Sequence, residues 1–169
     1  PLPSGRVSKK AALIIATGLG IVSVIILAIA HPLAGAIALI ANIFYAVVYT
    51  RFLKPNTSQN IVIGGAAGAV GPLIGWAGVT GELHWAAWAM FAIIFIWTPS
   101  HFWALALKYK DDYAKAGIPM LPVTHGEVVT RRQIFIYSVL LAPPLLALGL
   151  LPSMGPLFYT ASAAATAYY

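Results

Sequence analysis

The sequence contains no cysteine, so disulfides, thiolate metal sites and cysteine nucleophiles are all excluded. It is also poor in charge, because only 8% of its 169 residues are charged and only four residues are acidic. An average soluble domain carries about 25% charged residues. Hydrophobic residues make up 60% of the chain, and the mean hydropathy is +0.87. A chain this apolar cannot cover a soluble surface with polar groups, so we predict that lipid surrounds most of its length.

The two ends of the sequence suggest a truncated chain. It begins at Pro1 rather than Met, with no signal peptide before the first apolar run, and its last apolar run stops at Tyr169 without a polar flank. We therefore expect a fragment whose residues 1–169 form a single membrane-embedded domain.

The apolar runs predict membrane-spanning helices. A span needs about 20 apolar residues to cross about 30 Å of hydrocarbon, and its backbone must satisfy its own hydrogen bonds in lipid. We therefore predict an all-α fold, a polytopic transmembrane helix bundle. Prolines and glycines inside the runs, such as Gly71, Pro72 and Pro99, are expected to permit kinks. The predicted spans are five complete ones and the start of a sixth, near 11–30, 33–50, 61–80, 85–107, 133–150 and 157–169.

Basic residues are confined to alternate connections between these runs. In an up-down bundle alternate connections lie on one side, which the positive-inside rule identifies as cytoplasmic. This topological interpretation is preferred to a basic nucleic-acid-binding surface, so no nucleic-acid partner is expected. The same charges can nevertheless serve a polyanionic substrate. The ten basic residues are Arg6, Lys9, Lys10, Arg51, Lys54, Lys108, Lys110, Lys115, Arg131 and Arg132.

Asp111 and Asp112 form an acidic pair among lysines, in the stretch Lys108-Tyr-Lys-Asp-Asp-Tyr113. Paired carboxylates add nothing to a topology signal, but they suit Mg²⁺, which takes one or two protein carboxylates plus phosphate oxygens. Lys108 and Lys110 would then face the phosphates. The alternative is a solvated helix end with local ion pairs worth about 0–1 kcal/mol. In a helix adjacent aspartates diverge by about 100°, so at most one of the two is expected to point inward.

Two further polar residues lie at or inside the spans. Asn60 precedes a glycine-rich run, where it is a polar ligand at the mouth of a pocket, a helix N-cap, or both. His101 lies within a span, and a titratable residue at membrane depth is a functional candidate by default. Its alternative role is structural, with the ring bonded to a carbonyl that Pro99 frees. About 10–15 Å of helix separates His101 from 108–111, which predicts a deeper position in the same cavity.

Several motifs, in this order, resemble the protohaem IX farnesyltransferases, or haem O synthases, of the superfamily of intramembrane aromatic prenyltransferases. The resemblance covers most of the chain, and the opening Pro1–Ser8 is similar to the stretch that follows the family's first aspartate-rich motif. The motifs are Asn60-Ile-Val-Ile-Gly-Gly-Ala-Ala-Gly-Ala69, Gly75-Trp76, Val79-Thr-Gly81, Trp97-Thr-Pro99, His101-Phe-Trp103, Asp112-Tyr113 and Ala116-Gly-Ile-Pro-Met-Leu-Pro122.

The chain also departs from the family pattern. Pro55 stands where the family has a basic residue, which weakens a phosphate role for the loop after Lys54, and Gly71 and Ser100 stand where prolines are common. The family has about nine spans, of which this chain would hold about six, the third to the eighth. The family's first acidic motif would lie upstream of Pro1. The resemblance therefore implies that this fragment alone is inactive.

The activity implied by the resemblance is transfer of a farnesyl group from farnesyl diphosphate to a vinyl group of haem B, giving haem O. Haem B is then a substrate and Mg²⁺ the cofactor. The bilayer of a bacterial plasma membrane and haem A synthase are the further implied partners. Asp111 and Asp112 would hold the metal, while Lys108 and Lys110 would neutralise phosphate charge. The residues implied to contact the substrates are Lys54, Asn60, Trp97, His101 (toward haem) and Tyr113, with Phe102 and Trp103 along the prenyl channel.

Two other functions compete with this one. The first is a related prenyltransferase that acts on a quinone or chlorophyll precursor, against which the Trp97-Thr-Pro99 and Ala116–Met120 motifs argue. The second is a transporter with broken helices at mid-membrane. The titratable groups gather at one face rather than at the midplane, which favours the prenyltransferase.

Overall fold

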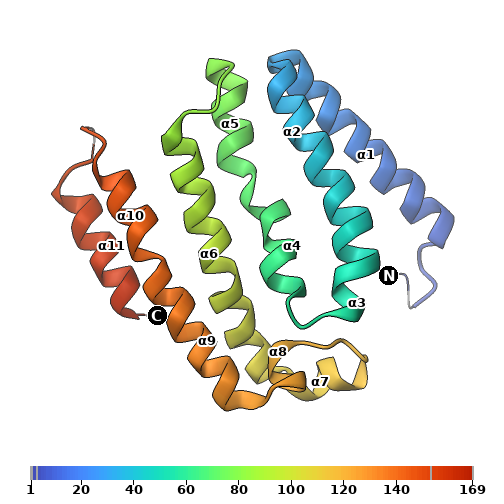
Figure 1. Ribbon diagram of the computed structural model, residues 1–169. Helices are drawn as coiled ribbons and strands as arrows, with labels where there is room; N and C mark the ends of the chain where they lie inside the picture. Colours follow the sequence, from blue (N-terminus) through green and yellow to red (C-terminus); the bar gives the residue numbers. More distant parts are fainter. Residues whose placement is uncertain (1, 3, 153, 169) are drawn as a thin grey trace.

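The chain folds into a bundle of helices in the computed structural model, which describes residues 2, 4–152 and 154–168 (Figure 1). These residues contain no strand, so the prediction of an all-α polytopic bundle is confirmed. The elements in chain order are α1 (Lys9–Ala30), α2 (Pro32–Ile43), the π-helix η1 (Phe44–Leu53), α3 (Lys54–Asn56), α4 (Asn60–Ala69), α5 (Gly71–Thr80), α6 (Trp85–Lys108), α7 (Lys110–Lys115), α8 (Leu121–Thr124), α9 (Gly126–Leu140), α10 (Ala142–Gly149) and α11 (Pro156–Tyr168).

Five helical stretches within the described residues are long and apolar enough to cross a membrane. They correspond to the five complete predicted spans. The sixth predicted span, 157–169, begins in α11, which has 13 residues, and its last residue, Tyr169, lies outside the described residues. The five stretches are Lys9–Ala30, Pro32–Asn56, Asn60–Thr80, Trp85–Lys108 and Gly126–Gly149.

Polar residues extend two of these helices beyond the hydrophobic runs. The Ser8 hydroxyl caps α1 by accepting a hydrogen bond from Ala11 N at 3.1 Å, so that helix begins at Lys9. Helix α9 begins at Gly126 rather than near Gln133. Hydropathy marks where lipid begins, whereas helical hydrogen bonding continues into the polar region beyond it. The start of α9 therefore places Glu127 and Arg131 on the same helix that enters the membrane.

Prolines interrupt two of the spans. Helix α4 ends at Ala69 and α5 begins at Gly71, with Pro72 in the first turn of α5. The span that contains α9 and α10 breaks at Leu141, just before a pair of prolines. Pro99 lies inside α6 without ending it. Because proline lacks a backbone N–H, each break follows from a missing donor in the helical ladder.

The segment Phe44–Leu53 is a π-helix, which hydropathy did not predict. Its wider turns are visible in two bonds across five residues: the Thr50 hydroxyl donates to Tyr45 O at 2.8 Å, and the Lys54 N–H bonds to Tyr49 O. π-Helical geometry is rare and occurs often at functional sites. Here it joins α2 to the polar end of the bundle.

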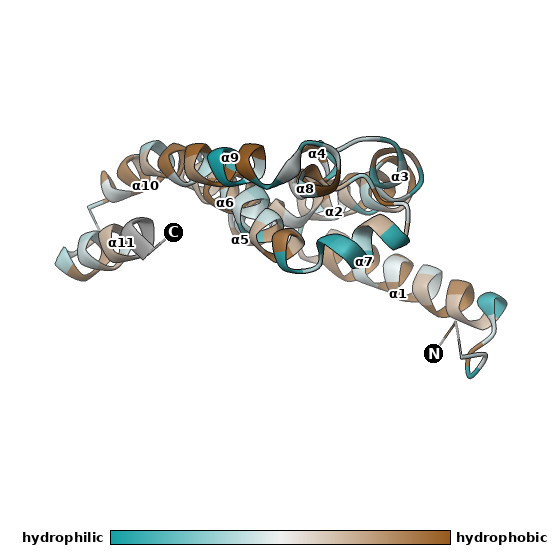
Figure 2. Cartoon of the chain, turned by 90° about the horizontal axis from the view of Figure 1, so that it is seen from below, coloured by the Kyte–Doolittle hydropathy of each residue, from teal (hydrophilic) through white to brown (hydrophobic). Residues whose placement is uncertain are grey.

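The connections that carry basic residues share one end of the bundle. The N-terminal stretch, the α3–α4 connection and the α6–α9 connection all lie toward the lower end of Figure 1, opposite the α1–α2 and α5–α6 turns. Viewed from that end, α7 and the first part of α9 carry hydrophilic colouring, whereas the spans are mostly hydrophobic (Figure 2). Polar chemistry therefore concentrates at this end.

Candidate functional site

A pocket of about 460 Å³ opens between η1, α4, α6 and the α7–α8 segment. We call it the aromatic pocket. It brings together five residues that the sequence analysis singled out, from four helices: Lys54, Asn60, Trp97, Phe102 and Tyr113. The lining residues are Tyr45, Tyr49, Lys54, Asn60, Ile61, Gly64, Gly65, Gly68, Ile94, Trp97, Thr98, Phe102, Tyr113, Ile118 and Met120.

Asn60 is the main buried polar group of this pocket. Its side chain is fully buried, and its Nδ2 donates a hydrogen bond to Lys54 O at 3.4 Å. Its Oδ1 has no hydrogen-bond partner among the described residues. The cap position of α4 is Gln59, so Asn60 does not act as a side-chain N-cap. A buried acceptor left unpaired costs about 1–3 kcal/mol, and a ligand in the pocket would recover that free energy.

Two tyrosines that the sequence analysis did not single out form one wall of the aromatic pocket. The rings of Tyr45 and Tyr49 stack with their centroids 5.1 Å apart. Their spacing of four residues is the one signal that would have placed them on a common face. The ring of Tyr49 packs so closely on Gly64 that a Cβ at this glycine would overlap it. A Cβ at Gly65 would lie 3.2 Å from Thr98 Cγ2, so α4 and α6 also meet closely.

Three residues of α6 follow one face of that helix. Trp97, His101 and Lys108 are separated by four and seven residues, which places them in a row. The rings of Trp97 and His101 stack with centroids 4.4 Å apart, and Phe102 meets His101 edge-on at 5.6 Å. Trp97 lines the aromatic pocket and His101 does not. His101 forms no hydrogen bond to a carbonyl within the described residues, so its observed contacts are aromatic.

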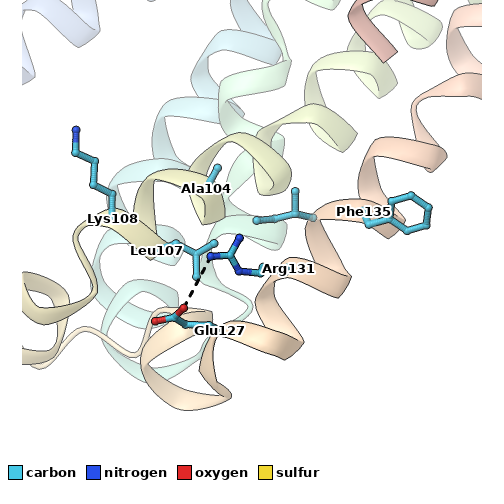
Figure 3. Close-up of a pocket in the computed structure, with 7 residues that line it drawn as sticks. Ala104, Leu107, Lys108, Glu127, Arg131 and Phe135 are labelled. Carbon is cyan, nitrogen blue, oxygen red and sulfur yellow. Dashed lines mark ion pairs between the residues drawn. The ribbon is translucent and has the colours of Figure 1, made fainter. Parts of the chain in front are cut away.

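A second hollow of about 610 Å³ lies between α6 and α9 (Figure 3). We call it the basic hollow. Its charged lining residues are Lys108, Glu127 and Arg131, and the Glu127 carboxylate forms ion pairs with Lys110 at 3.8 Å and Arg131 at 3.9 Å. The sequence analysis left Glu127 and Arg131 without a site role. The remaining lining residues are apolar: Ala104, Leu107, Ile134 and Phe135.

Asp111 and Asp112 lie in the first turn of α7 and are both exposed. They line neither cavity and form no ion pair within the described part of the chain. The same short helix has Lys110 paired with Glu127 at its start, and Tyr113 enters the aromatic pocket. The acidic pair therefore lies, along α7, between Lys110, whose ion-pair partner Glu127 lines the basic hollow, and Tyr113, which lines the aromatic pocket. Its metal-binding role stays a prediction.

Magnesium is the metal that this donor set would suit. No group of three or more His, Cys, Asp or Glu side chains able to hold a metal occurs among the described residues. Two unpaired adjacent carboxylates nevertheless match the one or two that Mg²⁺ takes from a protein when phosphate oxygens complete its shell. The arrangement thus fits a metal that arrives with a phosphorylated substrate better than one held permanently by protein ligands.

Comparison with known proteins identifies the family of this chain and several relatives. The UbiA prenyltransferase family matches residues 1–169. A Gloeobacter violaceus protein named "Protoheme IX farnesyltransferase" is 52% identical over 164 residues, which cover 96% of this chain and 54% of the relative. A Synechocystis protein of the same name is 55% identical over 144 residues, 85% of this chain and 46% of the relative.

A Synechococcus protein, again of that name, is 52% identical over 165 residues, 97% of this chain and 50% of the relative. The chain spans about half the length of the curated relatives it matches. No solved structure matches it.

Proposed function

This chain belongs to the UbiA prenyltransferase family, and from that premise we propose that it takes part in transferring a farnesyl group from farnesyl diphosphate to a vinyl group of haem B, giving haem O. The observation that carries the proposal is the aromatic pocket, which gathers Lys54, Asn60, Trp97 and Tyr113 at the polar end of the bundle. Relatives more than 50% identical carry the name "Protoheme IX farnesyltransferase", which supports this choice of prenyl donor and acceptor.

The reaction needs a site that separates charge and keeps bulk water away from the allylic cation. The C–O bond of farnesyl diphosphate breaks, its electron pair leaves with the diphosphate, and one vinyl carbon of haem B attacks the allylic cation to form a C–C bond. One water molecule then adds to the cation left on the other vinyl carbon and loses a proton, which gives the hydroxyl group of haem O. Aromatic faces such as those of Tyr45, Tyr49 and Trp97 stabilise a nearby cation. The apolar walls of the aromatic pocket exclude the water that would otherwise hydrolyse it.

The cations at the polar end would receive the leaving group. Lys54 lies at the mouth of the aromatic pocket, and Lys108 and Lys110 flank the start of α7. Asp111 and Asp112 would hold Mg²⁺. When bound, Mg²⁺ would neutralise charge on the diphosphate oxygens. Positioned positive charge of this kind is usually the largest single contribution to such catalysis.

The stacked rings of Trp97 and His101 on α6 suit a porphyrin acceptor. His101 stacks on Trp97, and a flat conjugated ring can extend such a stack. We therefore assign haem contact to His101, with Trp97 connecting it to the aromatic pocket. The buried Asn60 amide would supply a fixed polar contact to a bound substrate.

We infer a cellular setting from the charge pattern. The end of the bundle that carries the basic connections would face the cytoplasm of a bacterial plasma membrane. Haem O would then pass to an enzyme that converts it onward, for which haem A synthase is the natural partner. The second candidate function is prenylation of a quinone or chlorophyll precursor, which the same family membership would accommodate.

A chimaera tests the proposed function. The stretch of the Gloeobacter violaceus relative that aligns with this chain would be replaced by the chain itself. Membranes that contain the chimaera would be supplied with farnesyl diphosphate, Mg²⁺ and haem B, and products would be separated by chromatography and identified by mass. Haem O is the expected product. A chimaera that inserts normally, makes no haem O and prenylates a quinone precursor would overturn the proposal in favour of the second candidate.

A further inference from the structure

Glu127 sits among cations at the basic hollow. Its Oε1 lies 3.8 Å from Lys110 Nζ and its Oε2 lies 3.9 Å from Arg131 Nη2. Lys108 borders the same hollow from α6 and has no ion-pair partner within the described residues. Figure 3 shows Glu127 beside Arg131 on α9, with the Lys108 side chain extended away from them. One carboxylate is thus shared between two cations, Lys110 and Arg131.

These ion pairs are weak. The side chains are 39% exposed at Lys110, 53% at Glu127 and 71% at Arg131, and both distances are near the long limit for an ion pair. Solvent-exposed pairs of this kind contribute little to stability. The carboxylate therefore keeps the two cations near the hollow without binding them firmly, and an anion of higher charge can displace it.

We propose that Glu127 is an exchangeable counter-ion, which holds Arg131 at the basic hollow and Lys110 beside it in the absence of substrate, and releases both cations to the diphosphate of the prenyl substrate. The inference rests on the proposed function, because that function supplies a substrate with a diphosphate. Glu127 is a positioning residue in this scheme, since it acts through the two cations. It forms no bond in the reaction and is not a metal ligand.

The position of Lys110 gives this exchange a direct link to the acidic pair. Lys110 is the first residue of α7, and Asp111 and Asp112 follow it at once. The Lys110–Glu127 contact therefore ties the helix that carries the acidic pair to α9. A diphosphate that takes over both cations would keep the two helices linked through itself, with its remaining oxygens available to the metal.

A phosphate group could also come from an anionic lipid. Both ligands present phosphate oxygens to Lys110 and Arg131, but a diphosphate carries more charge than the single phosphodiester of a lipid headgroup. It therefore gains more from the two cations that Glu127 now pairs with. We propose the diphosphate as the ligand, and the lipid composition of the nanodiscs in the experiment distinguishes it from a lipid headgroup.

The experiment measures binding of inorganic diphosphate by calorimetry. The full chain would be held in nanodiscs of neutral phosphatidylcholine at low salt, without divalent metal. Glu127→Gln removes the competing carboxylate and should raise the affinity roughly threefold to tenfold, while Arg131→Gln should lower it by a similar factor. In the Arg131→Gln background the gain from Glu127→Gln should shrink. Glu127→Asp keeps the charge and should bind as the unchanged chain does.

Glu82→Gln is the matched control, because Glu82 is the acidic residue outside this end of the bundle and lines neither cavity. It should leave diphosphate affinity unchanged. Melting temperature is followed for every variant, and Glu127→Ser provides a second neutral substitution if Glu127→Gln lowers it markedly.

Unchanged or weakened diphosphate affinity in both neutral variants would overturn the proposal. So would an effect confined to nanodiscs that contain phosphatidylglycerol, since that would identify the ligand as a lipid headgroup. Failure of the proposed function gives a different result. If the chimaera makes no haem O but Glu127→Gln clearly raises diphosphate affinity, the counter-ion role of Glu127 is supported and the prenyl acceptor is a molecule other than haem B.

Discussion

The aromatic ring of Tyr49 lies directly against the backbone of Gly64, in the space that any larger side chain at residue 64 would occupy. This contact joins the π-helix η1 to α4 and forms one wall of the aromatic pocket. It makes the size of a single residue on α4 decisive for the shape of the pocket.

Gly64→Ala should therefore disrupt this wall. The added methyl would displace the Tyr49 ring, at a cost of about 1–3 kcal/mol for overpacking, and haem O formation by the chimaera should fall. Gly75→Ala is the control, because a Cβ there meets nothing within 4 Å. Adding Tyr49→Leu to Gly64→Ala should restore thermal stability. Equal effects at both glycines would show that helix flexibility matters rather than this contact.

Asp112→Asn tests the metal role of the acidic pair. If Asp112 holds Mg²⁺ on the diphosphate, the substitution should reduce turnover of the chimaera by about 10²-fold or more. The melting temperature should hardly change, because the residue is exposed in the first turn of α7. Haem O formation near the unsubstituted level would instead favour the alternative interpretation, in which Asp111 and Asp112 only form a solvated helix end.

His101→Ala separates a haem contact from a packing role. Loss of the stack on Trp97 should weaken haem binding, followed by its optical absorption, and leave farnesyl diphosphate binding largely unchanged. His101→Phe keeps an aromatic ring and should retain part of the haem affinity. Equal loss of haem binding and farnesyl diphosphate binding, with a lower melting temperature, would indicate that His101 has only a packing role.

Membrane orientation can be read with single cysteines, since the chain has none of its own. Ser58→Cys in the α3–α4 connection and Ala114→Cys in α7 should be shielded from an impermeant thiol reagent in intact cells. Glu82→Cys, in the α5–α6 turn, should be labelled. Labelling of the cysteine at position 58 or 114 from outside would show that the orientation is the opposite of the predicted one. Permeabilised cells, in which all three cysteines should react, provide the positive control.

Hydropathy predicted the bundle well because lipid imposes one requirement on every span. Helical hydrogen bonding inside an apolar run is the only arrangement available to these segments, so the five spans follow from run length alone. The helix breaks at Val70 and Leu141 follow equally from the prolines just after them. These features depend on local sequence.

The candidate site was harder to predict, because it depends on which faces of the helices pack against one another. Asn60, Trp97 and Tyr113 could be selected from their polarity, aromaticity and motifs, and the structure brings them into one pocket. Tyr45 and Tyr49 were missed, since an aromatic residue in a span usually only packs. Their role is visible through Gly64, on another helix, and no local pattern connects the two segments.

The geometry of η1 has a consequence for the direction in which Lys54 faces. An α-helix advances by about 100° per residue, whereas a π-helix fits more residues into each turn and so advances less. Over the ten residues from Phe44 to Leu53 this difference accumulates as a phase lag. An α-helical wheel drawn through the segment would therefore turn Lys54 away from the aromatic pocket. Loss of one residue within η1 would also rotate Lys54 about the helix axis, by the advance of that one residue, without altering its chemistry.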